Sequence, residues 1–203
     1  MRLLAVETAT EACSLALFEG SELLDHRHVE LGRGHAERLI PLIAELPGRG
    51  WADEIRVSLG PGSFTGVRIG LAAARALGLA WQAKVVGFPT LALVAATALR
   101  DRQEPVTVCM NGGHGEYFVQ NFSANGLAQG TVQSLAPEEA LKAVAHDLVA
   151  GNRAEALANL SKGQLRFLDI LPDATAVAML DPAQFTLSLA PIYGRGPDAK
   201  LPQ

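Results

Sequence analysis

Residues 60–70, Gly-Pro-Gly-Ser-Phe-Thr-Gly-Val-Arg-Ile-Gly, have the spacing most suggestive of chemistry in this chain. A strand-like run precedes them and a helical run follows, so backbone amides at the helix N-terminus could bind an anion. The segment is not a P-loop, a dinucleotide fingerprint or a nucleophile elbow, because the residues that define those motifs are missing or shifted. Alternatively, the glycines serve only a sharp turn and close helix packing. The candidate anion or nucleotide contacts are Gly60, Gly62, Ser63, Thr65 and Gly66.

A carboxylate, Glu7, ends the first strand-like run, and Thr8 and Thr10 follow it in a polar turn. A phosphotransferase or ATPase could place a carboxylate near Mg²⁺ at such a position. The corresponding turn in the second half, residues 111–114, has the sequence Asn-Gly-Gly-His and contains no carboxylate. A phosphoryl-transfer site built on both halves would therefore lack half of its acidic groups.

Histidines and cysteines do not form a metal-binding pattern. His26 and His28 alternate along one strand-like run, and His35 has no second histidine four residues later, as a helical zinc pair requires. Cys13 and Cys109 lie in apolar runs without a CxxC spacing. We therefore expect no metal site and two buried free thiols.

The elements that must position these residues follow from the periodicity of the apolar side chains. Residues 3–6, 14–18 and 23–29 read as three antiparallel strands, and residues 35–46 as an amphipathic helix ended by Pro-Gly. A strand at 55–59, a helix at 66–81, a short strand at 84–87 and a helix at 90–99 complete the first half.

A second meander with turns follows at residues 106–135, after a polar stretch at 100–105, and a helix begins at Pro137. Because the order of elements repeats, the sequence predicts two related α/β lobes, residues 1–100 and 101–203.

The helix at 66–81 has only two polar side chains between Val67 and Ala80, Arg68 and Arg75. At about 100° per residue, these arginines share one narrow face with Ala72 and Leu79, flanked by Leu71. Such a helix is either a central core helix or one whose outward face is covered by another protein.

Composition limits the remaining classes. The 203 residues are 49% hydrophobic and 19% charged with a formal net charge of -4, as in ordinary globular proteins, which excludes a disulfide scaffold, a collagen and a disordered chain. Without a basic run, the chain is a poor nucleic-acid binder by itself. With no secretory signal or membrane-length apolar run, we expect a cytoplasmic protein that does not bind a membrane.

Four segments together resemble the bacterial TsaB (YeaZ) family, in order along the whole chain. They are residues 4–14, 34–37, 60–70 and 191–199, of which the glycine-rich segment is the most specific. The resemblance implies a duplicated two-lobed fold of the ribonuclease H-like and actin-like type, found in actin, sugar kinases and Hsp70. It also implies a role in making threonylcarbamoyladenosine beside the tRNA anticodon.

In that family, the paralogue TsaD catalyses the transfer and carries the metal and nucleotide, and an ATPase, TsaE, joins the complex. The resemblance therefore implies that this chain is a non-catalytic partner that binds no cofactor alone and meets tRNA only through the complex. Family members dock to TsaD, or form homodimers, through their first two helices. Carried over to this sequence, the predicted interface is His35, Leu39, Leu42, Ile43, Arg68, Leu71, Ala72, Arg75 and Leu79.

Two positions depart from the family pattern. Glu7 replaces a common Asp, and residues 111–116, Asn-Gly-Gly-His-Gly-Glu, replace a typical Asp-Ala-Arg-Arg-Gly-Glu turn. The alternative function is a stand-alone small-molecule kinase or ATPase with the same fold, in which the glycine-rich turn holds phosphate. Proteolysis would need a metal pair or an activated nucleophile, and the sequence provides neither.

Overall fold

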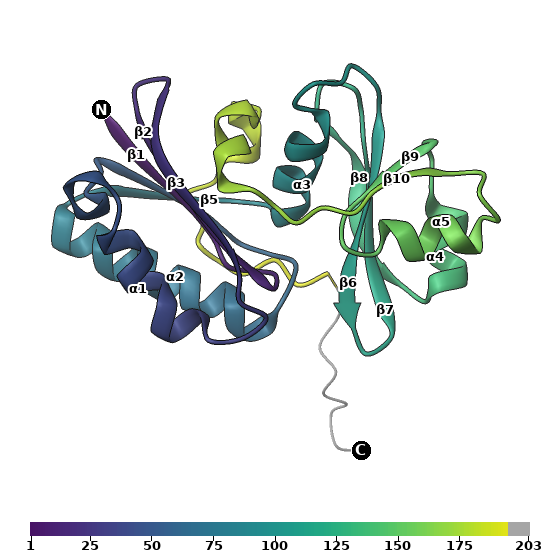
Figure 1. Cartoon of the computed structure of the whole chain (residues 1–203), viewed down its shortest axis with the longest axis horizontal. Helices are drawn as coiled ribbons and strands as arrows, with labels where there is room; N and C mark the ends of the chain where they lie inside the picture. Colours follow the sequence, from purple (N-terminus) through teal and green to yellow (C-terminus); the bar gives the residue numbers. More distant parts are fainter. Residues whose placement is uncertain (195–203) are drawn as a thin grey trace.

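The first half of the chain folds into a mixed five-stranded sheet in the computed structural model, which describes residues 1–194 (Figure 1). Strands β1 (Arg2–Glu7), β2 (Ala12–Glu19) and β3 (Glu22–Glu30) form the predicted antiparallel meander. Strands β4 (Glu54–Ser58) and β5 (Lys84–Phe88) then add in parallel beside β1. The resulting order is β3-β2-β1-β4-β5.

The second half repeats this arrangement. Strands β6 (Val106–Gly113), β7 (Glu116–Phe122) and β8 (Ala128–Leu135) form the second antiparallel meander. Two short strands, β9 (Leu148–Ala150) and β10 (Arg166–Leu168), pair in parallel on the other side of β6. Read from β8, the order is β8-β7-β6-β9-β10, which matches the first sheet strand for strand. The predicted duplicated α/β fold of the ribonuclease H-like and actin-like type is confirmed.

Helices α1 (His35–Ala44) and α2 (Phe64–Trp81) lie on the same side of the first sheet (Figure 1). The structure starts α2 two residues earlier than predicted, because the Ser63 side chain accepts a hydrogen bond from the Gly66 amide and caps the helix. α1 ends before the predicted Leu46, and a 3-10 turn, η1 (Pro47–Gly50), follows it. In the second lobe, α4 (Pro137–Ala143) and α5 (Ala154–Leu160) cover the face of the sheet that points away from the first lobe.

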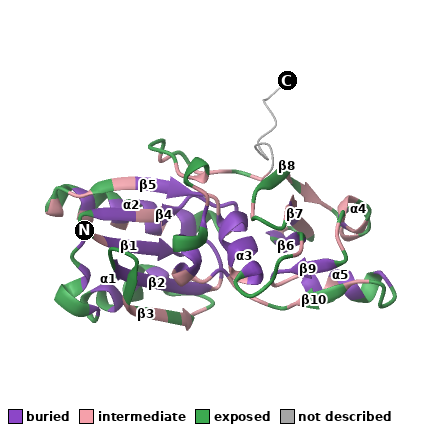
Figure 2. Cartoon of the chain, turned by 90° about the horizontal axis from the view of Figure 1, so that it is seen from above, coloured by how far each residue is buried: buried purple, intermediate pink, exposed green. Residues whose placement is uncertain are grey.

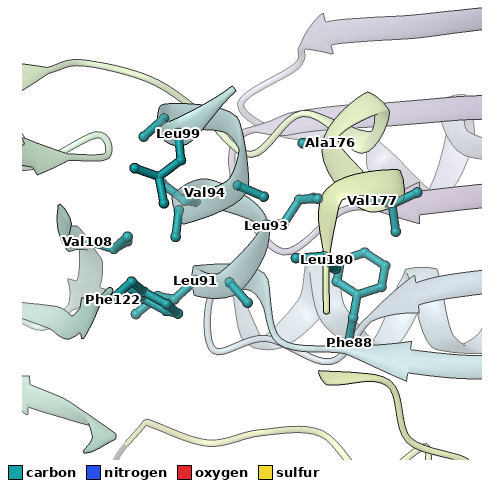
Figure 3. Close-up of a cluster of buried hydrophobic side chains, with 14 of the residues drawn as sticks. Phe88, Leu91, Leu93, Val94, Leu99, Val108, Phe122, Ala176, Val177 and Leu180 are labelled. Carbon is teal, nitrogen blue, oxygen red and sulfur yellow. The ribbon is translucent and has the colours of Figure 1, made fainter. Parts of the chain in front are cut away.

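Helix α3 (Thr90–Leu99) lies between the two sheets and is buried almost all round (Figure 2). Its sequence is apolar on every face, as expected for a helix enclosed by other elements. In Figure 3, Leu91 and Val94 point toward Val108 and Phe122 of the second sheet. Phe88, at the end of β5 in the first sheet, belongs to the same cluster. One hydrophobic core therefore joins the two lobes.

The last described stretch returns to the first lobe. The 3-10 helix η2 (Ala174–Met179) packs against α3 and the meander of the first sheet, and η3 (Pro182–Gln184) follows. Thr186 and Gly87 exchange two backbone hydrogen bonds, and the Ile192 amide donates to the Leu59 carbonyl at 2.7 Å. The expected second lobe, residues 101–203, thus includes a returning segment, residues 174–194, that packs against the first lobe and buries Ala174, Ala176 and Val177 in the shared core. None of the helices within residues 1–194 is long and apolar enough to cross a membrane.

We expect Leu93→Ala to lower the free energy of unfolding by about 2–5 kcal/mol, because it leaves a cavity in the core that both lobes share. Leu93 is 0% exposed, whereas Leu79 is 84% exposed and provides a matched control. Leu79→Ala should change stability by about 0.5 kcal/mol or less. Urea unfolding followed by circular dichroism measures both values, and equal losses in the two variants would contradict the shared core.

Candidate functional site

A cleft of about 1290 Å³ lies between the two lobes. The first lobe contributes the turn after β1 (residues 9–11), the start of α1 with the loop before it (32–37), and the glycine-rich turn with the start of α2 (61–66). The second lobe contributes residues 110–114, Phe118 and Asn152. The returning segment, residues 174–194, contributes its residues 192–194. The cleft is therefore lined by most of the segments that the sequence predicted to be functional, including the glycine-rich turn and residues 111–114.

The glycine-rich turn packs directly against the turn that follows β1. A Cβ on Gly62 would lie 2.2 Å from the Ala9 carbonyl oxygen, and a Cβ on Gly66 would lie 2.1 Å from that of Thr8. The Ser63 amide donates a hydrogen bond to the Ala9 carbonyl at 2.7 Å. The amides of Ser63 and Gly66 thus already have partners within the chain. Close packing accounts for both glycines.

The remaining predicted anion contacts occupy different surroundings. Gly60 is buried with φ +89°, a value that favours glycine, and its carbonyl accepts a hydrogen bond from the Thr90 amide. Thr65 is exposed in the first turn of α2 and lines the cleft. An anion contact at this helix terminus stays a prediction.

Glu7 is fully buried at the end of β1. One carboxyl oxygen, Oε1, accepts a hydrogen bond from the Ala9 amide at 2.5 Å, and Oε2 has no hydrogen-bond partner. Burial raises the pKa of Glu7 to about 7, and the Ala9 amide and the hydroxyls of Ser58 and Thr90 partly offset this increase. The two hydroxyls themselves lack good hydrogen-bond geometry. Near neutral pH, a large share of the molecules therefore carries Glu7 as a neutral acid.

The histidines make separate contacts and do not converge on one site. The buried His35 ring places Nε2 3.2 Å from the Ala12 carbonyl, and the His28 ring places Nδ1 3.1 Å from the Ser14 hydroxyl. His114 is exposed in the β6–β7 turn, and Glu116 accepts a hydrogen bond from Ser134. Within residues 1–194, no group of three or more His, Cys, Asp and Glu side chains is arranged to hold a metal ion.

The predicted interface on α1 needs correction. His35, Leu39, Leu42 and Ile43 are all at most 6% exposed, and the three aliphatic side chains belong to the core between α1, α2 and the first sheet. Their spacing marks the stripe that faces the helix's own sheet, which leaves the opposite stripe outside. The exposed side of α1 instead carries Ala36, Glu37, Arg38, Ile40, Pro41 and Ala44.

On α2, the predicted interface is partly at the surface. Leu71 is 2% exposed and belongs to the core, whereas Ala72, Arg75 and Leu79 are exposed. The Arg75 guanidinium donates to the Leu189 carbonyl at 2.9 Å, so it also holds the returning segment.

Arg68 is half-buried rather than free. Its guanidinium donates to the Tyr193 hydroxyl at 2.6 Å and lies 3.2 Å from the centroid of the Phe64 ring. Phe64 and Tyr193 are themselves 65% and 56% exposed. The sequence did not predict either aromatic residue as part of the site, although Phe64 lies at the start of α2 within the glycine-rich segment.

The repeated sheets, the shared helix and the cleft define a class: duplicated α/β proteins with two actin-like lobes facing a central cleft. A family model described as "TsaD: tRNA N6-adenosine threonylcarbamoyltransferase" matches residues 29–183, more than half of the chain. The chain belongs to the family that this model describes, and its similarities within that family place it with TsaB (YeaZ).

Three relatives support this placement. The chain is 35% identical to the "tRNA threonylcarbamoyladenosine biosynthesis protein TsaB" of Escherichia coli, over 68% of this chain and 64% of that protein. It is also 35% identical to TsaB of Haemophilus influenzae, over 59% of this chain and 53% of that protein. The solved structure of YeaZ from Pseudomonas aeruginosa superposes with a TM-score of 0.79 at 27% identity, covering 95% of this chain and 99% of that one. The chain thus spans less than two thirds of the length of the two curated relatives.

Glu7→Gln should stabilise the protein increasingly as the pH rises. The folded-state pKa of about 7 lies above the unfolded value of about 4.5, so the wild-type protein loses stability from pH 4.5 upward and the loss is complete above about pH 7. Gln stays neutral and avoids that loss, which the pKa difference places at about 3 kcal/mol. Urea unfolding of both proteins at pH 5 and pH 8 measures the difference. Parallel pH profiles for the two proteins would contradict a raised Glu7 pKa, and Glu155→Gln, at an exposed position, provides the control.

Gly66→Ala should destabilise the protein by about 3 kcal/mol, the upper end of overpacking penalties, because its Cβ would meet the rigid Thr8 carbonyl. Thr65→Ala, one residue earlier and exposed, should have little effect. Thermal unfolding of the two variants separates these cases. A Gly66→Ala protein as stable as Thr65→Ala would show that the turn does not need this close approach.

Proposed function

We propose that this chain is a non-catalytic, TsaB-type subunit of a cytoplasmic complex that transfers a threonylcarbamoyl group to the adenosine next to the tRNA anticodon. It acts by binding a TsaD-like paralogue, and a TsaE-like ATPase completes the complex. ATP and metal belong to those partner subunits, and tRNA is reached only through the complex. The relatives named TsaB support the pathway, and the surface of α2 supports the mode of action.

The outward face of α2 is the observation that carries the proposal. Leu79 is 84% exposed, and Ala72, Ala76 and Ala80 lie exposed on the same helix. The inward face is also apolar, since Val67, Leu71 and Ala74 belong to the core. Arg68 and Arg75 share the outward side, where they donate to the Tyr193 hydroxyl and the Leu189 carbonyl. A helix with an apolar side toward its own sheet and a largely apolar side toward solvent is typical of one that buries the second side against a partner. Small side chains on that side allow a partner helix to approach closely.

Two neighbouring features enlarge this surface. Ile40 of α1, which packs beside α2, is 47% exposed. At the start of α2, Phe64 stacks with Arg68 and extends toward the cleft. Exposed aromatic and arginine side chains are common anchors in protein interfaces. We therefore define the docking face as Ile40, Phe64, Ala72, Ala76 and Leu79.

The same face also fits a second copy of this chain, so a homodimer is the state expected when the paralogue is missing. The competing function is a kinase or ATPase with its site in the cleft. Two observations argue for the subunit instead. The amides of Ser63 and Gly66 already donate hydrogen bonds within the chain, and the turn at 111–114 in the second lobe has no carboxylate. Binding of ATP to the isolated chain with micromolar affinity would favour the enzyme.

Leu79→Asp should weaken binding to the purified TsaD-like paralogue of the same organism by at least tenfold, because a carboxylate would be buried in an apolar contact. Isothermal titration calorimetry measures the affinity, and thermal unfolding should be nearly unchanged because position 79 is exposed. Leu71→Asp is unsuitable for this test, since that side chain is in the core.

Leu187→Asp is the matched control, because Leu187 is 71% exposed but lies on the returning segment, outside the docking face. It should leave the affinity unchanged. Equal affinities for wild type and Leu79→Asp would refute docking through α2. No binding by the wild-type chain at any concentration would refute the subunit proposal as a whole.

A further inference from the structure

We infer that Glu11 and Asn152 form a latch across the cleft that holds the two lobes at a fixed separation and, through the same turn, fixes the start of α1. The inference stands independently of the proposed function, because it concerns the cleft and not the partner.

The latch joins residues 141 positions apart in the sequence. The Asn152 side-chain amide, in the loop between β9 and α5, donates from Nδ2 to the Glu11 carboxylate at 2.8 Å. Glu11 lies in the turn between β1 and β2, so the bond runs from the second lobe to the first at the wall of the cleft. A hydrogen bond to a charged acceptor is stronger than one between neutral groups.

Each end of the latch is tied to its own lobe. On the second lobe, Asn152 Oδ1 accepts a hydrogen bond from the Asn111 backbone amide at 2.9 Å. Both polar atoms of the Asn152 side chain are thereby used, which leaves it one orientation. The side chain cannot rotate away from Glu11 without losing both bonds.

On the first lobe, the turn that carries Glu11 also holds the loop before α1. The Glu11 carbonyl accepts hydrogen bonds from the amides of Leu31 and Gly32, at 2.9 and 3.0 Å. The next carbonyl, that of Ala12, contacts the ring of His35, the first residue of α1. A change in the position of Glu11 would therefore be passed to the start of α1.

The latch complements the core around α3. That core joins the lobes on one side, but the cleft on the other side is lined mainly by loops and turns. Two lobes that are joined on one side of a cleft can rotate about that junction. The Glu11–Asn152 bond joins the lobes at the wall of the cleft and opposes this rotation.

Paired spin labels test the latch directly. Glu37→Cys on α1 and Glu155→Cys on α5 place labels at exposed positions on the two lobes. The native Cys13 and Cys109 are 0% exposed, and burial raises the pKa of their thiols to about 11 and about 12, so they should not react. Pulsed electron–electron double resonance then measures the distribution of distances between the two labels.

In this labelled protein, Asn152→Asp keeps the acceptor for the Asn111 amide but turns a carboxylate toward Glu11. We expect a longer and broader distance distribution, because the two like charges repel. Glu11→Gln alone should leave the distribution unchanged, since its Oε1 still accepts from Asn152. The double variant Glu11→Gln with Asn152→Asp should restore the wild-type distribution, because the Gln amide can donate to Asp.

If Asn152→Asp does not fold, Glu11→Ala removes the acceptor without adding charge and should give the same lengthening. In the open variants, hydrogen exchange at the Leu31 and Gly32 amides should accelerate by on the order of tenfold, since their acceptor turn loses its anchor. An unchanged distribution in Asn152→Asp or Glu11→Ala, or a failure of the double variant to restore it, would overturn the latch. Unchanged exchange with altered distances would overturn the link to α1.

Discussion

Burial of one apolar helix between two sheets is the constraint on which the rest of this structure depends. Every face of α3 is covered, by the first sheet and η2 on one side and by the second sheet on the other. Removal of this apolar area from water favours the association of two lobes that would otherwise each expose one sheet face. The cleft exists because this core joins the lobes without covering the turns at 9–11, 61–66 and 110–114.

The cleft has the size of a ligand site, but several polar groups around it form hydrogen bonds within the chain itself. The Thr8–Ala9 backbone packs on the glycine-rich turn and provides an acceptor for the Ser63 amide. Glu7, buried beneath this turn, has a raised pKa and is insulated from solvent. Glu11 accepts from Asn152 rather than pointing freely into the opening. The first two contacts lie within the first lobe, whereas the Glu11–Asn152 bond joins the two lobes.

Helix α2 contributes both to the cleft and to the exposed surface of the first lobe. Its glycines at 66 and 70 contact Thr8, its apolar inner face fills the core of the first lobe, and its outer face carries Leu79 in solvent. Arg68 and Arg75 hold the returning C-terminal segment to the same helix. The docking face that we propose is thus supported from behind by the sheet and from the side by a segment more than 100 residues away in the chain.

The sequence by itself determined the elements of the first lobe, the second meander and the helix at Pro137, and with them the duplication, because period-2 and period-3.6 patterns reflect which sides of a strand or helix meet a core. The short elements β9, α5, β10, η2 and η3 were not predicted. The sequence also located the glycine-rich turn and the apolar character of α2. It could not decide which apolar stripe faces outward: His35, Leu39, Leu42 and Ile43 have the spacing of an interface and of a core alike, and the structure buries them. Only the tertiary structure decided this, and with it the raised pKa of Glu7 and the Glu11–Asn152 bond. Each of these depends on neighbours that are distant in sequence, and a local pattern does not encode which distant residues will meet.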